Sequence, residues 1–205
     1  MTGARRIPLG TAALVLWLAA VFGLEHLWGG PSYTPTLARM GAELPARIRD
    51  GELYRLLAAT QLHSGVLHLF MNLWVLATLG LFLEPALGSA RLLILYVISG
   101  LGGSLLGTFL SDVTSASGMS VGASGALAGL LTATAVSAWW PKASAQLFVS
   151  LPGSLKPIAA INMAILVGGS LHEGVDYLAH LGGALAGLLC ALWFFAGTLP
   201  APPVF

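Results

Sequence analysis

Residues 62–83 read LHSGVLHLFMNLWVLATLGLFL, a run that contains two histidines and no Asp, Glu, Lys or Arg. A helix needs about 20 mostly apolar residues to cross the hydrocarbon core of a bilayer, because each residue rises about 1.5 Å. The run therefore predicts a membrane-spanning helix. Polar side chains are costly inside such a helix unless they are paired or functional, so His63, His68 and Asn72 also mark a candidate site.

The rest of the chain repeats the apolar pattern. Of its 205 residues, 57% are hydrophobic and 8% are charged, whereas soluble domains carry about a quarter charged residues. The composition predicts an all-α membrane protein that forms one membrane domain over residues 1–205. The charged segment 29–61 is predicted to be a long first loop. On the length criterion, the sequence predicts a bundle of six spans: 8–28, 62–83, 91–110, 122–140, 155–172 and 178–197.

The composition also excludes other classes of protein. The formal net charge of +1 gives no basic surface for nucleic acid. The single cysteine, Cys190, excludes an intramolecular disulfide. The first apolar run follows Arg5 and Arg6, as a secretory signal would, but it lacks a clear cleavage site, so we expect a retained helix. The bias towards Ala, Leu and Gly favours a bacterial source, and hence a multi-pass protein of the plasma membrane.

The distribution of basic residues predicts the orientation. With the N-terminus in the cytoplasm, the short outer loops 111–121 and 173–177 contain no Lys or Arg. The arginines of the first loop are accompanied by Glu43, Asp50 and Glu52. The positive-inside rule therefore favours a cytoplasmic N-terminus. The cytoplasmic segments would then hold Arg5, Arg6, Arg91, Lys142 and Lys156.

Two later spans begin with polar residues. The fourth begins with Gly122-Ala123-Ser124-Gly125, and the sixth begins with Ala179-His180-Leu181-Gly182-Gly183. The second, fourth and sixth spans all start at the same membrane face, the outer one in the predicted orientation. His68 and Asn72 are four residues apart and share one face of the second span. We therefore expect Ser124, His180, His68 and Asn72 to lie at one depth.

This set of side chains is typical of nucleophilic catalysis. A serine hydroxyl is a weak nucleophile until a base takes its proton, and histidine has a suitable pKa. Ser124 is the candidate nucleophile and His180 the candidate general base. The tetrahedral intermediate needs hydrogen-bond donors aimed at the developing oxyanion. His68, Asn72 and the backbone N–H of Ser124 can donate, the last at a helix start where the helix dipole favours negative charge.

Glycines predict where the helices approach one another. Gly125 and Gly129 share one face of the fourth span, and Gly183 and Gly187 share one face of the sixth. Both pairs have the small-xxx-small spacing of closely packed membrane helices. A bulky residue at these positions would separate the two backbones.

The run His63-x4-His68-x3-Asn72, then Gly122-x-Ser124-Gly125, then Ala179-His180-x2-Gly183-x3-Gly187 resembles the signature of the rhomboid proteases over roughly residues 52–195. The resemblance implies a six-helix rhomboid-like bundle that cleaves single-pass membrane proteins near the outer membrane face with a Ser–His dyad. It also implies a first loop partly embedded beside the bundle and a fifth helix that helps to admit substrate. Further positions that resemble the family are Arg55, Glu84 and Gly88.

One position departs from the family pattern. The family usually has a bulky aromatic residue four positions after the serine, and this chain has Ala128. Gly122 and His63 are expected to support the oxyanion donors. For His63 a place at the water boundary beside Gln61 is an equal alternative.

Two other functions are compatible with parts of the sequence. Gly-x-Ser-Gly alone is common in membrane helices, where serine bonds to its own backbone. The conjunction of three motifs in order favours a protease over a non-catalytic rhomboid-like protein that binds membrane clients. A solute transporter is less favoured, because the spans lack a charged pair at mid-membrane.

No metal or cofactor is expected. His63 and His68 are five residues apart, so on one helix they would face away from each other. Residues 172–176 read HEGVD and lack the second histidine of a zinc-protease motif. Asp176 lies four residues before His180, but in a predicted loop, which favours a dyad over a triad.

Overall fold

The computed structural model describes residues 8–111, 118–139, 161–166 and 177–196. The predictions that concern residues 1–7, 112–117, 140–160, 167–176 and 197–205, including the one about Asp176, lie outside the described residues. Every regular element in the described part is a helix, and residues 161–166 are helical too. In chain order the labelled elements are α1 (Leu9–Leu27), α2 (Thr34–Met40), α3 (Pro45–Arg49), α4 (Arg55–Ala58), η1 (Ala59–Gln61), α5 (Val66–Leu87), α6 (Ser89–Leu110), α7 (Ser124–Trp139) and α10 (Tyr177–Ala196).

Four of these helices, α1, α5, α6 and α10, are long and apolar enough to cross a membrane. The 16 residues of α7 span about 24 Å, somewhat less than the hydrocarbon core. The prediction of an all-α membrane bundle is confirmed, and the chain is a multi-pass membrane protein. The fifth predicted span, 155–172, is described only at residues 161–166, so the count of six spans stays a prediction.

The second span differs from its predicted range of 62–83. The chain makes a 3-10 turn at residues 59–61, and α5 begins only at Val66. Gly65, immediately before it, has a φ of 155°, a conformation that favours glycine. His63 therefore precedes the helix. The prediction that His63 and His68 face apart is wrong, because it assumed one continuous helix. Their ring centroids lie 5.1 Å apart in an edge-to-face arrangement.

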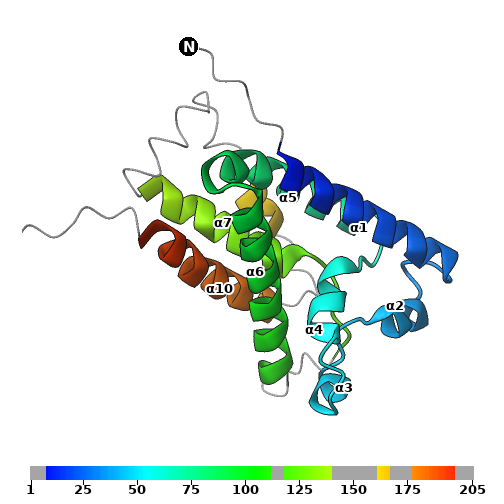
Figure 1. Ribbon diagram of the computed structural model, residues 1–205. Helices are drawn as coiled ribbons and strands as arrows, with labels where there is room; N and C mark the ends of the chain where they lie inside the picture. The colour runs from blue at the N-terminus through cyan, green and yellow to red at the C-terminus, as the bar shows by residue number, and fades with distance from the viewer. Residues whose placement is uncertain (1–7, 112–117, 140–160, 167–176, 197–205) are drawn as a thin grey trace, which may run out of the picture.

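Glycines bring α6, α7 and α10 into backbone contact. Figure 1 shows α7 and α10 running alongside each other, with α6 crossing both. A Cβ added to Gly183 would overlap the carbonyl oxygen of Gly125, and one added to Gly187 would overlap the backbone of Gly129. A Cβ added to Gly103 of α6 would lie 2.6 Å from the carbonyl oxygen of Ala179. Small residues at such contacts let membrane helices pack through van der Waals contact.

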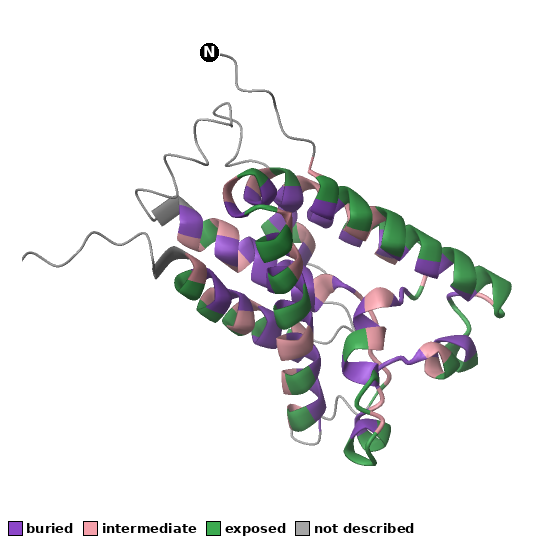
Figure 2. Cartoon of the chain, in the orientation of Figure 1, coloured by how far each residue is buried: buried purple, intermediate pink, exposed green. Residues whose placement is uncertain are grey.

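The N-terminal helix α1 is fixed to α5 near its start by Glu84. The Glu84 carboxylate accepts hydrogen bonds from the backbone N–H groups of Gly10 and Thr11, at 2.7 and 2.8 Å. The hydroxyls of Thr11 and Ser89 donate to it as well, both at 2.6 Å. These bonds satisfy orphan donors at a helix N-terminus. In Figure 2 the buried residues of α1 form a stripe along one side, while the rest of the helix is exposed.

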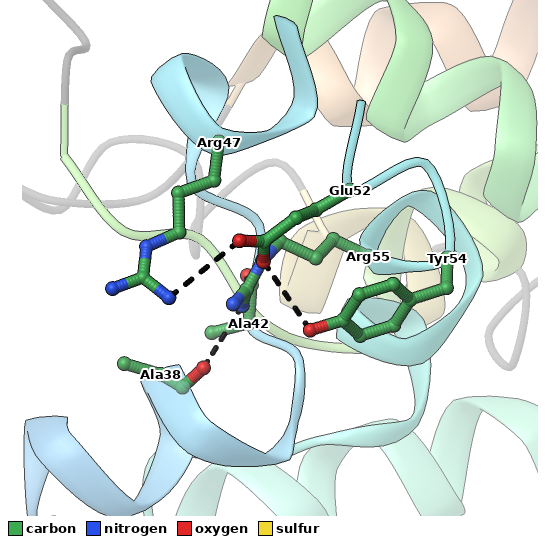
Figure 3. A network of polar contacts seen from close by, with 6 residues as sticks. All are labelled: Ala38, Ala42, Arg47, Glu52, Tyr54 and Arg55. Atoms are coloured by element: carbon green, nitrogen blue, oxygen red, sulfur yellow. Dashed lines mark hydrogen bonds and ion pairs between the residues drawn. The ribbon is translucent and has the colours of Figure 1, made fainter. Parts of the chain in front are cut away.

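The first loop is a folded unit centred on the buried guanidinium of Arg55, which is 1% exposed (Figure 3). Arg55 donates to the carbonyl oxygens of Ala38 and Ala42, both at 2.9 Å, and to Glu52 Oε2 at 2.6 Å. The hydrogen bond from Arg55 holds the pKa of the Glu52 carboxyl below its ordinary value. One charged side chain thus joins α2, α4 and the turn between α3 and α4.

Candidate active site

The chain approaches Ser124 along a segment that the first loop holds in place. Glu43 and Ser120 form an isolated β-bridge, with N···O distances of 2.9 and 3.1 Å. The backbone N–H of Gly122 donates to the carbonyl oxygen of Ala59 at 3.0 Å. Helix α7 then begins at Ser124. The first N–H groups of a helix lack partners within the helix, so the N-terminal end of α7 is a place where negative charge is stabilised.

Gly122 is required for the approach of this segment to His68. Its φ is 130°, and a Cβ added there would lie 2.7 Å from both Cε1 and Nε2 of the His68 ring. Because its N–H is already bonded to Ala59, Gly122 serves the site through close packing.

The starts of α7 and α10 lie against each other. A Cβ added to Gly125 would lie 3.0 Å from the carbonyl oxygen of Ala179. These two residues adjoin Ser124 and His180 in the chain. Ser124 and His180 also line the same cavity. The glycine packing therefore brings the candidate nucleophile and the candidate base together.

Ser124 lines two cavities. The larger, of about 950 Å³, is mainly apolar and lies between α5, the 161–166 segment and the starts of α7 and α10. We call it the large cavity, and its polar lining comprises Ser64, His68, Asn72, Ser124 and His180. The smaller, of about 330 Å³, is called the small cavity. Its polar lining comprises Glu43, Thr60, Ser64, His68, Ser104, Ser120 and Ser124.

Of the two predicted donors on α5, His68 lies closer to Gly122, on the segment that leads to Ser124. Its Nδ1 is 3.1 Å from the Ser64 hydroxyl and 3.4 Å from the Ser64 backbone nitrogen. Asn72 is 4% exposed and donates one amide N–H to the carbonyl oxygen of His68 at 3.0 Å. An amide has two N–H donors, so Asn72 keeps a second one for the large cavity.

His63 is placed differently from the other predicted site residues. It is fully buried, and it lines neither cavity. Its backbone N–H donates to Glu25 Oε1 at 2.9 Å. Burial, aided by the neighbouring His68, lowers the pKa of His63 to about 3. His63 is thus buried rather than exposed at a water boundary, and its ring packs against that of His68. Its part in the site stays a prediction.

The depressed pKa of His63 predicts acid sensitivity. The ordinary pKa of a histidine is 6.5, so His63 is protonated below about pH 6.5 in the unfolded state. In the folded state it is protonated only below about pH 3. Stability is therefore lost as pH falls through this window, by about 3 kcal/mol at pH 4.5 from this group. The free energy of unfolding in detergent should fall more steeply between pH 6.5 and 4.5 in the parent than in His63→Asn. Equal slopes in the two proteins would contradict this prediction.

Several residues of the site were not anticipated. Ser64 and Glu25 contact the histidines, and Ala59 fixes the Ser124 segment. Their side chains have no motif of their own. The sequence offered two weak signals of their role. Ser64 lies between two histidines, and Glu25 places a carboxyl group at the end of an apolar run.

The amino-acid sequence is similar to a known protein family and to several of its members. Residues 50–197 match the model of the rhomboid domain family. RHOMBOID-like protein 5 of Arabidopsis thaliana is 40% identical over 171 residues, covering 80% of this chain and 50% of the relative. Rhomboid protease GluP of Bacillus subtilis is 31% identical over 185 residues, covering 90% of this chain and 34% of the relative. The chain thus spans half or less of the length of these two relatives.

Proposed function

Because the chain belongs to the rhomboid family, we propose that it is an intramembrane serine endopeptidase, with Ser124 as nucleophile and His180 as general base. The observation that carries the proposal is the large cavity, in which Ser124, His180, His68 and Asn72 meet at the starts of three helices. A relative of this chain is named a rhomboid protease. No cofactor or metal takes part in the proposed reaction.

The proposed reaction proceeds in two steps. Ser124 Oγ attacks the scissile carbonyl carbon while His180 takes its proton, and His180 then gives that proton to the leaving amine. Water, activated by His180, hydrolyses the acyl-enzyme and frees Ser124. The oxyanion of each tetrahedral intermediate receives hydrogen bonds from His68, Asn72 and the N–H of Ser124. Ser124 also lines the small cavity, whose lining includes the carboxyl of Glu43 and several hydroxyl groups, which supports the arrival of water from that side.

The proposed substrates are single-pass membrane proteins. The α5 wall of the large cavity presents Val66, Leu67 and Met71, which are exposed. The opposite wall presents Ile161, which is exposed as well. An apolar cavity open between two helices suits an apolar segment that enters from the bilayer. With the N-terminus in the cytoplasm, cleavage takes place near the outer face of what we propose is a bacterial plasma membrane.

The test is incubation of the purified chain, in detergent or liposomes, with a single-span reporter protein. We expect one discrete cleavage within or beside the reporter's apolar segment. A chain that binds the reporter without cleaving it would support the non-catalytic client-binding alternative and overturn the protease. Cleavage that persists unchanged in Ser124→Ala would also overturn it.

The oxyanion donors give a graded prediction. Removing one such donor typically costs about 10²–10³ in turnover. We expect His68→Ala to lie in this range. Asn72→Ala should lose less, because one of its two donors is bound to the His68 carbonyl. Neither should match Ser124→Ala, since backbone donors remain. Parental kcat in both variants, measured on protein with the parental melting temperature, would assign α5 a structural role only.

A further inference from the structure

We propose that Glu25 of α1 is a positioning residue for the His68 donor, acting through the His63–Ser64 segment. The inference rests on the proposed protease function, because that function makes His68 an oxyanion donor. Glu25 lies in the last turn of α1, a helix that contributes no residue to either cavity. Its influence on the site would therefore be indirect.

The first link joins Glu25 to the turn before α5. Glu25 is fully buried, and its Oε1 accepts the backbone N–H of His63 at 2.9 Å. Its own backbone carbonyl accepts the N–H of Gly30 at 2.8 Å, which closes the end of α1. Glu25 thus links the C-terminal end of α1 to the backbone of His63, the residue before Ser64.

The second link joins this turn to the His68 ring. The backbone N–H of Ser64 points to His68 Nδ1 at 3.4 Å, and the Ser64 hydroxyl lies 3.1 Å from the same atom. A backbone N–H can only donate, so Nδ1 acts as an acceptor. A neutral imidazole then carries its proton on Nε2. Ser64 thereby selects the tautomer that can donate from Nε2.

The third link places that donor. The Cε1 and Nε2 edge of His68 faces Gly122, two residues before Ser124. The His63 ring packs against His68 from another side, with centroids 5.1 Å apart. A shift of the His63–Ser64 segment would therefore change both the tautomer of His68 and the direction of its N–H.

Burial supports a functional reading of this contact. Within the described residues, Glu25 Oε2 is buried without a hydrogen-bond partner. Such groups cost free energy in a membrane helix bundle and tend to be kept for function. Glu84 offers the matched comparison, since it is also buried and also holds α1 to α5. Its hydrogen bonds to Gly10 and Thr11 lie at the opposite end of α1, away from the cavities.

The decisive comparison uses two variants of similar length in the full chain. Glu25→Gln keeps an acceptor oxygen for the His63 N–H, whereas Glu25→Met fills the same space without one. We expect Glu25→Met to lower kcat for a single-span reporter about tenfold, with KM little changed, because a misdirected donor loses part of its transition-state stabilisation. Glu25→Gln should stay within about threefold of the parent. Glu84→Met should lower the melting temperature yet keep the parental kcat per folded molecule.

A second readout does not depend on proteolysis. In protein labelled with ¹⁵N-histidine, the parent should show His68 protonated on Nε2 and unprotonated on Nδ1, with the signals assigned by their loss in His68→Ala. Glu25→Met should show a mixture of tautomers, and Glu25→Gln the parental form. If Glu25→Met does not fold, Glu25→Ala takes its place.

The cleavage rates and the tautomer spectra distinguish a failure of the Glu25 proposal from a failure of the proposed protease function. A parental His68 tautomer in the variant that lacks the acceptor would overturn the proposal, whether or not the parent cleaves. So would a loss of kcat in that variant no larger than in Glu84→Met. A parent that cleaves nothing would sink the protease assignment, and the tautomer spectra alone would then decide the role of Glu25.

Discussion

Ser124→Ala and His180→Ala should each lower reporter cleavage by about 10⁴-fold or more, while both proteins melt like the parent. The serine supplies the attacking oxygen, and the histidine supplies the base without which that oxygen remains a weak nucleophile. Because the two act as one unit, the double variant should be little worse than either single variant. Initial cleavage rates over a range of enzyme concentrations would measure the loss.

Helix α7 contains a matched control. The Ser137 hydroxyl donates to the carbonyl oxygen of Thr134 at 2.7 Å, a bond within its own helix. Ser137→Ala should therefore cleave like the parent. A His180→Ala protein that retained a tenth of the parental rate would show that another group takes the proton, and would contradict the dyad.

Gly183→Val should abolish detectable cleavage and lower the melting temperature markedly. A Cβ at position 183 would overlap the carbonyl oxygen of Gly125, which is backbone and cannot rotate away. Helices α7 and α10 must then separate at the level of Ser124 and His180. Overpacking at a backbone contact costs about 3 kcal/mol or more. Gly183→Ala should show the same defects to a smaller degree.

Gly23 provides the control for a glycine in a membrane helix. A Cβ added there would meet nothing within 4 Å. Gly23→Ala should therefore keep the parental activity and melting temperature. A stable and active Gly183→Val protein would mean that the two helices do not depend on this contact.

The membrane class and the glycine contacts were predictable from the sequence, because each rests on local rules. Span length follows from the apolar runs. The small-xxx-small spacing of Gly125, Gly129, Gly183 and Gly187 predicted the backbone contacts that the structure has. The meeting of Ser124 with His180 was expected from the common face at which their helices begin.

The surroundings of His68 were not predictable, because they depend on non-local contacts. A turn before α5 removes His63 from the helix, and the φ of 155° at Gly65 is visible only in three dimensions. The Glu25 contact joins residues 38 positions apart. Arg55 organises the first loop through backbone carbonyls, which carry no side-chain signature in a sequence.

The most direct test of the central claim is labelling with a fluorophosphonate probe, followed by peptide mapping of the labelled chain. An activated serine forms a stable bond to the probe's phosphorus, whereas ordinary serines do not react. We predict a single labelled residue, Ser124, with labelling lost in Ser124→Ala and greatly slowed in His180→Ala. Label on another residue, or equal labelling rates in the parent and His180→Ala, would contradict the assignment of Ser124 and His180 as nucleophile and base.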